Sequence, residues 1–213
     1  MLSACQILAE RYHLTTQQIG QFQLYLAQLK AWNQKFNLTA ITTDSEIINY
    51  HFVDSLALSA LLDCSKLAVV ADVGSGGGFP GLPLKIMFPD LKLILIEVNG
   101  KKVQFLQKLV ESLNLTDVTV VQQDWRTFIR GAQYQIDLFC ARASLQVEEL
   151  LRVFKPSSEY QRAQLVYWAA ADWQANQQAQ VYLVREQAYQ VGDRNRKLVL
   201  FENVLPVQKG INL

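Results

Sequence analysis

The first third of the chain repeats apolar residues at helical spacing. From a capping Thr15 or Thr16 to Trp32, apolar positions recur every three or four residues and would form one buried stripe. A second helical pattern covers residues 46–62, after Asp44 or Ser45. We therefore expect residues 1–66 to form a helical extension packed on a single core of residues 67–213.

From residue 67 onward, short apolar runs replace the amphipathic stripes. Five of them are typical of strands buried in a parallel sheet, at 68–73, 91–98, 118–121, 136–141 and 165–169. Helical patterns at about 101–113 and 145–154 separate some of these strands. The runs 181–189 and 197–204, joined by a turn at 192–196, predict an antiparallel hairpin. Together they predict an α/β fold with a Rossmann-like, mostly parallel sheet of seven strands.

A glycine-rich loop joins the first strand to the helix that follows it. The sequence D-V-G-S-G-G-G-F-P-G runs from Asp72 to Gly81, and Pro83 suits the first position of the helix. Because glycine has no side chain, its backbone can approach a ligand closely, as in nucleotide-binding domains. The spacing fits two ligand classes. One pattern is that of dinucleotides (Gly76, Gly78, Gly81), and the other is that of S-adenosylmethionine, or SAM (Asp72, Gly74, Gly76, Gly78).

The charge of Asp72 favours SAM over NAD. A carboxylate two residues before the first glycine would repel a pyrophosphate, which needs N–H donors and a helix N-terminus. SAM instead carries an ammonium and a sulfonium, which a carboxylate attracts directly or through water. Seven strands also match a methyltransferase sheet better than a six-stranded dinucleotide domain.

Polar residues at the ends of the next strands extend this site. Glu97 lies 23 residues after Gly74, where a carboxylate can bind both ribose hydroxyls; the alternative is an exposed charge at a strand end. Asp124 could accept from an adenine amino group with Trp125 stacked on the ring. Equally, Asp124 could cap a helix and Trp125 could lie in the core.

Three further polar groups have two interpretations each. Arg142 follows the fourth strand, which would place it near the centre of methyl transfer. Alternatively, it only caps a helix or binds a surface phosphate. His51 and Asp54 share a helix face, as a polar pair at the ligand cleft or as an ordinary hydrogen-bonded histidine. Lys101 and Lys102 could meet phosphate or be solvated.

Composition narrows the remaining classes. The 213 residues carry a net charge of +1, so binding to a nucleic acid would need a local basic patch. The three cysteines show no C-x-x-C spacing and there are two histidines, so we expect neither a disulfide framework nor a metal site. We expect neither a leader nor a membrane helix, because no charged-then-apolar segment opens the sequence and no apolar run approaches the roughly 18 residues of a membrane helix. We expect a cytoplasmic monomer without a membrane partner.

Several motifs between Trp32 and Phe154 together resemble one family, the 16S ribosomal RNA small-subunit methyltransferase G proteins (RsmG, also called GidB). In chain order they are W-N-x-x-F-N-L-T (Trp32–Thr39), H-F-V-D-S-L (His51–Leu56), D-V-G-S-G-G-G-F-P-G-L-P-L (Asp72–Leu84), L-I-E-V-N-G-K-K (Leu95–Lys102), F-L (Phe105–Leu106) and A-R-A (Ala141–Ala143). The resemblance implies the class I SAM-dependent methyltransferase fold and methylation of a guanine at N7 in 16S rRNA or the small ribosomal subunit.

The resemblance also implies SAM contacts at Gly74, Phe79, Trp125, Arg126 and Arg142. With the residues derived above, the predicted cofactor site comprises Asp72, Gly74, Ser75, Gly76, Gly78, Phe79, Glu97, Asp124, Trp125, Arg126 and Arg142. The candidate RNA-binding patch comprises Lys101, Lys102, Arg126 and Arg142. Guanine N7 has a free lone pair, so no general base is needed and Arg142 is predicted to be a positioning group.

The chain departs from the usual family pattern at three places, one of which is the glutamine-rich region after Phe154, which matches the family poorly. Family members usually have a small residue and Glu where this chain has Trp125-Arg126, and Lys-Gly where it has Ala169-Ala170-Ala171. Two alternatives therefore stay open. One is a divergent SAM-binding member that binds a partner without methylating rRNA. The other is an NAD-dependent oxidoreductase, against which Asp72 argues.

Overall fold

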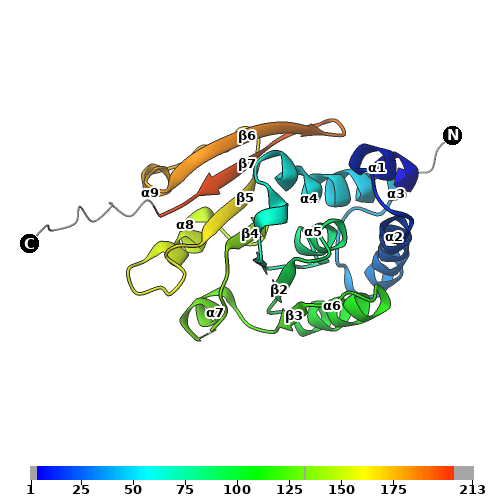
Figure 1. Ribbon diagram of the computed structural model, residues 1–213, viewed down its shortest axis with the longest axis horizontal. Coiled ribbons are helices and arrows are strands. Elements are labelled where there is room, and N and C mark those ends of the chain that lie inside the picture. The colour runs from blue at the N-terminus through cyan, green and yellow to red at the C-terminus, as the bar shows by residue number, and fades with distance from the viewer. Residues whose placement is uncertain (1–3, 132, 204–213) are drawn as a thin grey trace, which may run out of the picture.

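A seven-stranded sheet in the order β3-β2-β1-β4-β5-β7-β6 organises the protein (Figure 1). The structure is a computed structural model that describes residues 4–131 and 133–203. The first five strands are parallel, and β7 is antiparallel to both β5 and β6. The expected α/β fold and its C-terminal hairpin are confirmed.

The strands follow the apolar runs to within a few residues at each end. They are β1 (Val69–Val73), β2 (Lys92–Ile96), β3 (Val118–Val121), β4 (Leu138–Arg142), β5 (Gln164–Ala170), β6 (Leu183–Val191) and β7 (Arg194–Phe201). The parallel register aligns Val73 with Ile96 and with Ala141. The carboxyl ends of β1, β2 and β4 therefore meet at one edge of the sheet, where ligands bind in folds of this kind.

Helices cover both faces of the sheet. They are α1 (Ala4–Tyr12), α2 (Thr16–Phe36), α3 (Asp44–Ile47), α4 (Asp54–Leu56), α5 (Gly81–Met87), α6 (Gly100–Ser112), α7 (Trp125–Gly131), α8 (Val147–Leu150) and α9 (Gln177–Gln180). A π-helical segment (Ile48–Val53) and 3₁₀ segments (Ala57–Ala60, Cys64–Lys66, Leu151–Phe154) complete them. Thr15 caps α2 in a capping box with Gln18. Of the two alternatives Thr15 and Thr16, the first is therefore the cap.

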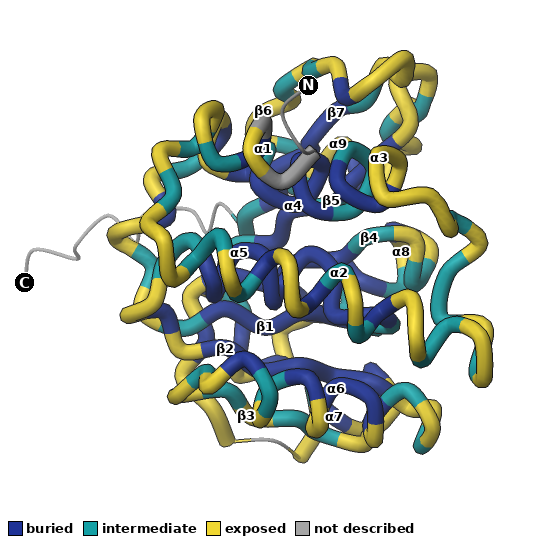
Figure 2. Tube along the Cα trace, turned by 90° about the vertical axis from the view of Figure 1, so that its right-hand side faces the viewer, coloured by how far each residue is buried: buried dark blue, intermediate teal, exposed yellow. Residues whose placement is uncertain are grey.

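The N-terminal helices share one apolar core with the sheet. Phe22, Tyr25 and Phe52 are buried in the same cluster as Leu93 and Leu95 of β2. On the opposite face of the sheet, α7 and α8 pack against the strand residues that alternate with Leu93 and Leu95, such as Ile94 and Ile96 of β2. Figure 2 shows β1 and β2 as buried tubes between the partly exposed helices. The boundary between an extension ending at residue 66 and a core starting at residue 67 stays a prediction.

Four local expectations were wrong in detail. The helical pattern at 46–62 is divided into α, π, α and 3₁₀ segments that begin at Asp44. Helix α5 begins at Gly81, so Pro83 is its third residue, where a missing N–H still breaks no helical hydrogen bond. The helix at 145–154 is one α-helical turn followed by a 3₁₀ turn. The hairpin turn is shorter than 192–196, and Val204 lies outside the described residues.

Within residues 4–131 and 133–203, no helix combines the length and the apolar character that a membrane span requires. Over the same ranges, no three metal-ligating side chains gather into a possible ion site.

Candidate functional site

The glycine loop begins where β1 ends and turns back across β2. The amides of Gly74 and Ser75 both donate to the carbonyl of Ile96, at 2.8 and 3.1 Å. Gly74 has a φ of +68°, and a Cβ at this position would lie 2.5 Å from the Cβ of Ser144. Any larger residue would therefore be strained and would collide with the turn after β4. Glycine at position 74 lets the ends of β1 and β4 meet.

Asp72 lies beneath the loop. Its side chain is fully buried, and Oδ2 accepts from the Gly81 amide at 2.9 Å. Oδ1 is buried without a hydrogen-bond partner among the described residues. Burial raises the pKa of Asp72 to about 7, although the Gly81 amide and Arg142 favour its charged form. Asp72 thus anchors the first amide of α5, and its role in cofactor binding stays a prediction.

Glu97 connects the end of β2 to the glycine loop. Its Oε2 accepts from the Gly76 amide at 2.9 Å and Oε1 accepts from the Asn99 amide at 2.8 Å. Only 5% of the residue is exposed, so the alternative of an exposed charge at a strand end is wrong. Each carboxylate oxygen retains acceptor capacity for a ligand hydroxyl.

A pocket of about 280 Å³ opens at this edge of the sheet. It brings together residues that follow β1, β2, β3 and β4, which are far apart in the sequence. Its lining is Val73, Gly74, Ile96, Glu97, Val98, Lys102, Gln123, Asp124, Trp125, Ala143, Ser144 and Leu145. Of the predicted cofactor residues, Gly74, Glu97, Asp124 and Trp125 line it. The remaining seven, Asp72, Ser75, Gly76, Gly78, Phe79, Arg126 and Arg142, are not among the lining residues.

Asp124 and Trp125 combine structural contacts with a place at the pocket. The Asp124 carboxylate caps α7 by accepting from the Thr127 amide (3.1 Å) and hydroxyl (2.6 Å), and these hydrogen bonds lower the pKa of Asp124. Trp125 is 5% exposed, and its indole donates to the Glu149 carbonyl at 2.9 Å. The cap and the core position are confirmed, while the adenine contacts stay predictions.

Phe79 ties the loop to the N-terminal helices. Its ring stacks on His51 with centroids 4.4 Å apart and on Tyr25 with centroids 5.3 Å apart. The Tyr25 hydroxyl donates to the Gly77 carbonyl at 2.6 Å. Tyr25 was missed in the sequence because it lies in the apolar pattern of α2, where nothing local marks a hydroxyl that binds a loop 52 residues away.

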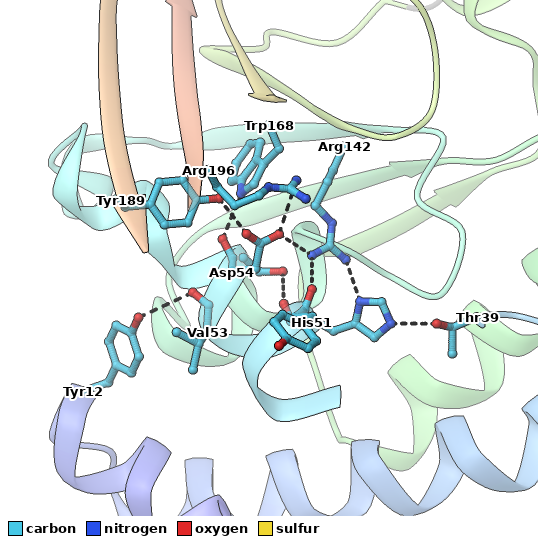
Figure 3. Close-up of polar contacts among 11 residues, drawn as sticks. Tyr12, Thr39, His51, Val53, Asp54, Arg142, Trp168, Tyr189 and Arg196 are labelled. Atoms are coloured by element: carbon cyan, nitrogen blue, oxygen red, sulfur yellow. Dashed lines mark hydrogen bonds and ion pairs between the residues drawn. The ribbon is translucent and has the colours of Figure 1, made fainter. Parts of the chain in front are cut away.

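Arg142 ends β4 inside a polar cluster (Figure 3). Its Nη1 donates to Asp54 Oδ2 at 2.8 Å and to the Tyr50 carbonyl at 3.0 Å. Its Nη2 lies 3.1 Å from Nδ1 of His51. The guanidinium also stands over the Phe79 ring, 5.1 Å from the centroid. The side chains of Arg142 and Asp54 are only 9% and 3% exposed.

His51 is a partnered, buried histidine that also adjoins the glycine loop. Burial and the neighbouring Arg142 charge lower its pKa to about 3, so the imidazole is neutral near pH 7. His51 is thus an ordinary hydrogen-bonded histidine of the fold, and it also stacks on Phe79 of the glycine loop. Its place at the ligand cleft stays a prediction.

The four predicted RNA-binding cations have different surroundings. Arg126 is exposed but forms two hydrogen bonds with the Glu149 carboxylate, at 2.7 and 2.8 Å. Arg142 is held in the buried cluster. Lys101 and Lys102 lie in the first turn of α6, and neither forms an ion pair within the described parts of the chain. The two lysines are therefore the freer half of the patch.

Two further cations lie near this edge and were not singled out in the sequence. Lys197 and Arg196 of β7 stand opposite Ala169 and Ala170 of β5. Because the pairing is antiparallel and joins segments about thirty residues apart, no local pattern could reveal it.

Comparison with known proteins gives a consistent family match. The sequence model of the family described as rRNA small subunit methyltransferase G (GidB) matches residues 18–199. A ribosomal RNA small subunit methyltransferase G from Roseiflexus castenholzii is 43% identical over 145 residues, covering 67% of this chain and 62% of that protein. One from Staphylococcus saprophyticus is 38% identical over 154 residues, covering 71% and 64%. The chain therefore spans a little under two thirds of the length of these relatives.

Solved structures share the fold at low sequence identity. A putative methylase from Haemophilus influenzae superposes with a TM-score of 0.53 at 14% identity, covering 71% of this chain and 88% of that one. TrmK from M. capricolum, solved with S-adenosylhomocysteine, gives a TM-score of 0.51 at 16% identity, covering 67% and 66%. These likenesses confirm the class I methyltransferase fold.

Proposed function

The chain belongs to the rRNA small subunit methyltransferase G family, and from this premise we propose that it transfers a methyl group from SAM to N7 of a guanine in 16S rRNA. The observation that carries the proposal is the pocket at the carboxyl edge of the sheet. The pocket is lined by the backbone of Gly74, where a Cβ would collide with Ser144, and by the buried carboxylate of Glu97, and this combination suits a nucleoside-containing ligand.

The residues of the pocket fit SAM. Glu97 keeps acceptor capacity for ribose hydroxyls, and Trp125 together with apolar Val98 and Leu145 can flank the adenine. SAM, when bound, supplies an electrophilic methyl group on a positively charged sulfur. The fit at Asp72 is indirect, since its carboxyl supports the loop from below.

The chain's own residues would orient the reactants and exclude water. N7 of guanine attacks with a lone pair, so no residue has to remove a proton. The neutral His51 already has hydrogen-bond contacts at both ring nitrogens, and the Asp72 carboxyl is sealed beneath the loop. Neither is placed as a general base, which supports Arg142 as a positioning group.

The proposed partner is 16S rRNA or the small ribosomal subunit, and a ribosomal substrate would place the activity in the cytoplasm. Lys101 and Lys102 are the cations most available to RNA phosphates, with Arg126 and Arg142 as further candidates that would have to share existing carboxylate partners. A monomeric state stays a prediction.

A divergent SAM-binding protein without rRNA methylation is the second candidate. One observation favours it: two of the four cations predicted to bind RNA are already paired with Glu149 and Asp54. Membership of a methyltransferase family argues against the oxidoreductase alternative. The charge of Asp72 is no longer an argument against a pyrophosphate, because its carboxyl accepts from the Gly81 amide and Asp72 is not among the residues that line the pocket.

The test is transfer of labelled methyl from SAM to small ribosomal subunits that lack the family's modification, followed by nucleoside digestion. Label in N7-methylguanosine would support the proposal. SAM binding without any label would favour the second candidate. Gly74→Ala should lower the affinity for SAM at least tenfold and reduce transfer, whereas the matched control Gly20→Ala, at a position with no atom within 4 Å of the added Cβ, should retain both.

A further inference from the structure

A polar cluster beside the glycine loop joins segments from four parts of the chain. We define the Arg142 cluster as Thr39, His51, Asp54, Arg142 and Tyr189 (Figure 3). It connects the loop after α2, the π-helical segment with α4, the end of β4, and the C-terminal hairpin. Its centre is the guanidinium of Arg142.

The Arg142 guanidinium is only partly occupied by hydrogen bonds within the described residues. Three hydrogen bonds, to Asp54, the Tyr50 carbonyl and His51, use three of its five N–H groups. The N–H of Nε and the second N–H of Nη2 have no acceptor among the described residues. Because the planar group is fixed by three acceptors and by the Phe79 ring, its remaining donors point in one defined direction.

The contact between His51 and Arg142 specifies one state of the imidazole. A guanidinium can only donate, so Nδ1 of His51 must carry the lone pair. Nε2 then carries the proton and donates to the Thr39 hydroxyl oxygen at 2.8 Å. Thr39 is itself fixed, since the Asn33 side chain bonds both its amide and its carbonyl, at 2.8 and 2.9 Å.

Asp54 is anchored from the opposite side. Its Oδ1 accepts from the Tyr189 hydroxyl at 2.6 Å, and its Oδ2 accepts from Arg142 and also lies 3.9 Å from Nη2 of Arg196. Its backbone carbonyl accepts from the Trp168 indole at 2.8 Å. The carboxylate is therefore held by Tyr189 and Arg196 as well as by Arg142.

The π-helical turn supplies the third acceptor. In an α-helix the Tyr50 carbonyl would accept from the amide of Asp54. Here that amide donates instead to the carbonyls of Asn49 and His51, and the Tyr50 carbonyl accepts from Arg142. A local departure from α-helical geometry thus contributes to the cluster, as is common at functional sites.

We propose that His51 and Asp54 are positioning residues for methyl transfer, which hold the Arg142 guanidinium against Phe79 so that its two free N–H groups meet the bound reactants in one orientation. The proposal rests on the function proposed above. Neither residue has to touch a reactant, since both act through Arg142.

Three substitutions at His51 separate its two hydrogen bonds. In His51→Asn the amide oxygen can replace Nδ1 and keep the contact with Arg142, whereas in His51→Gln the longer side chain can replace Nε2 and keep the contact with Thr39. His51→Phe keeps a ring on Phe79 and loses both contacts. We expect kcat for methyl transfer to fall roughly 10- to 100-fold in the Gln and Phe variants, because small misplacements of a catalytic constellation have effects of this size. The Asn variant should stay within about threefold of the unchanged protein, since the acceptor for Arg142 remains.

A merely structural role would give a different order. In that case kcat would follow the loss of melting temperature in each variant, and the Asn and Gln variants would be equally impaired. That result, with normal methyl transfer by the unchanged protein, would refute the positioning role and leave the proposed function intact. No transfer by the unchanged protein would refute both.

A spectroscopic measurement tests the geometry independently of activity. The chain contains only two histidines, His13 and His51. In protein labelled with ¹⁵N-histidine, His13→Gln would leave the signals of His51 alone. We expect an unprotonated Nδ1, a protonated Nε2 and no titration between pH 5 and 8. A protonated Nδ1, or titration near pH 6.5, would overturn the proposal.

Discussion

Replacing Asp72 by Asn should change how stability depends on pH. The folded pKa of Asp72 is raised by burial from 3.8 to about 7. The folded protein therefore holds a proton that the unfolded chain releases, and stability is lost as pH rises from about 4 to about 7. An Asn side chain cannot ionise, so the variant escapes this loss. Its amide oxygen can still accept from the Gly81 amide, as Oδ2 of Asp72 does.

The size of the effect follows from the two pKa values. Each unit of difference in pKa corresponds to about 1.4 kcal/mol. From pH 5 to pH 8 the unchanged protein should lose roughly 2.5 kcal/mol that Asp72→Asn keeps, with most of the change complete by about pH 7. The absolute stability of the variant also contains a constant penalty, because the new amide N–H₂ would occupy the place where Oδ1 has no partner. The change with pH, and not the value at one pH, is the informative quantity.

Urea unfolding at pH 5, 6, 7 and 8, at constant ionic strength and without cofactor, measures this difference. Asp124→Asn is the matched control. Asp124 is an exposed cap whose pKa is lowered by Thr127, so it is ionised throughout this range and its variant should show a constant difference. A constant difference for Asp72→Asn as well would refute the conclusion that the buried carboxyl is protonated near neutral pH.

Three further predictions concern other parts of the site. Because the folded pKa of His51 is lowered, the free energy of unfolding falls as pH falls below about 6.5. In urea unfolding, His51→Phe should therefore lose less stability between pH 6.5 and 4.5 than the control His13→Gln. An equal loss of stability in the two variants would contradict the lowered pKa. Gly74→Ala should lower the affinity for SAM at least tenfold in calorimetry, because the added Cβ collides with Ser144 and φ is +68°; unchanged affinity would remove the loop from the cofactor site. Changing Lys101 and Lys102 to Ala together should weaken ribosomal RNA binding and reduce its salt slope by about 2, since each phosphate contact contributes about one unit, and an unchanged slope would exclude both lysines from the interface.

Much of the fold could be predicted because its determinants are local. Local structure determines several of these residues: the apolar runs at β1 to β5, the capping Thr15 and the glycines at positive φ. The motifs from Trp32 to Ala143 indicated the family, and Glu97 was placed at the pocket by its distance from Gly74 alone. These features depend on chain geometry over a few residues or on a fixed strand-helix-strand spacing.

The partners of the polar side chains depended on the tertiary structure. Asp72 was predicted to attract the ligand, which stays a prediction; the structure adds its bond to the amide of Gly81, which the sequence did not indicate. Arg142 was located at the right strand end, yet its acceptors lie about ninety residues away, on a helix whose π-helical turn was not predicted. Tyr25 of α2 donates to the carbonyl of Gly77, which lies 52 residues later in the chain. The sequence by itself determined the sheet, the loop and the order of the segments, because periodicity and backbone conformation are local properties. Only the tertiary structure decided which buried charge meets which partner, because that depends on how distant segments pack.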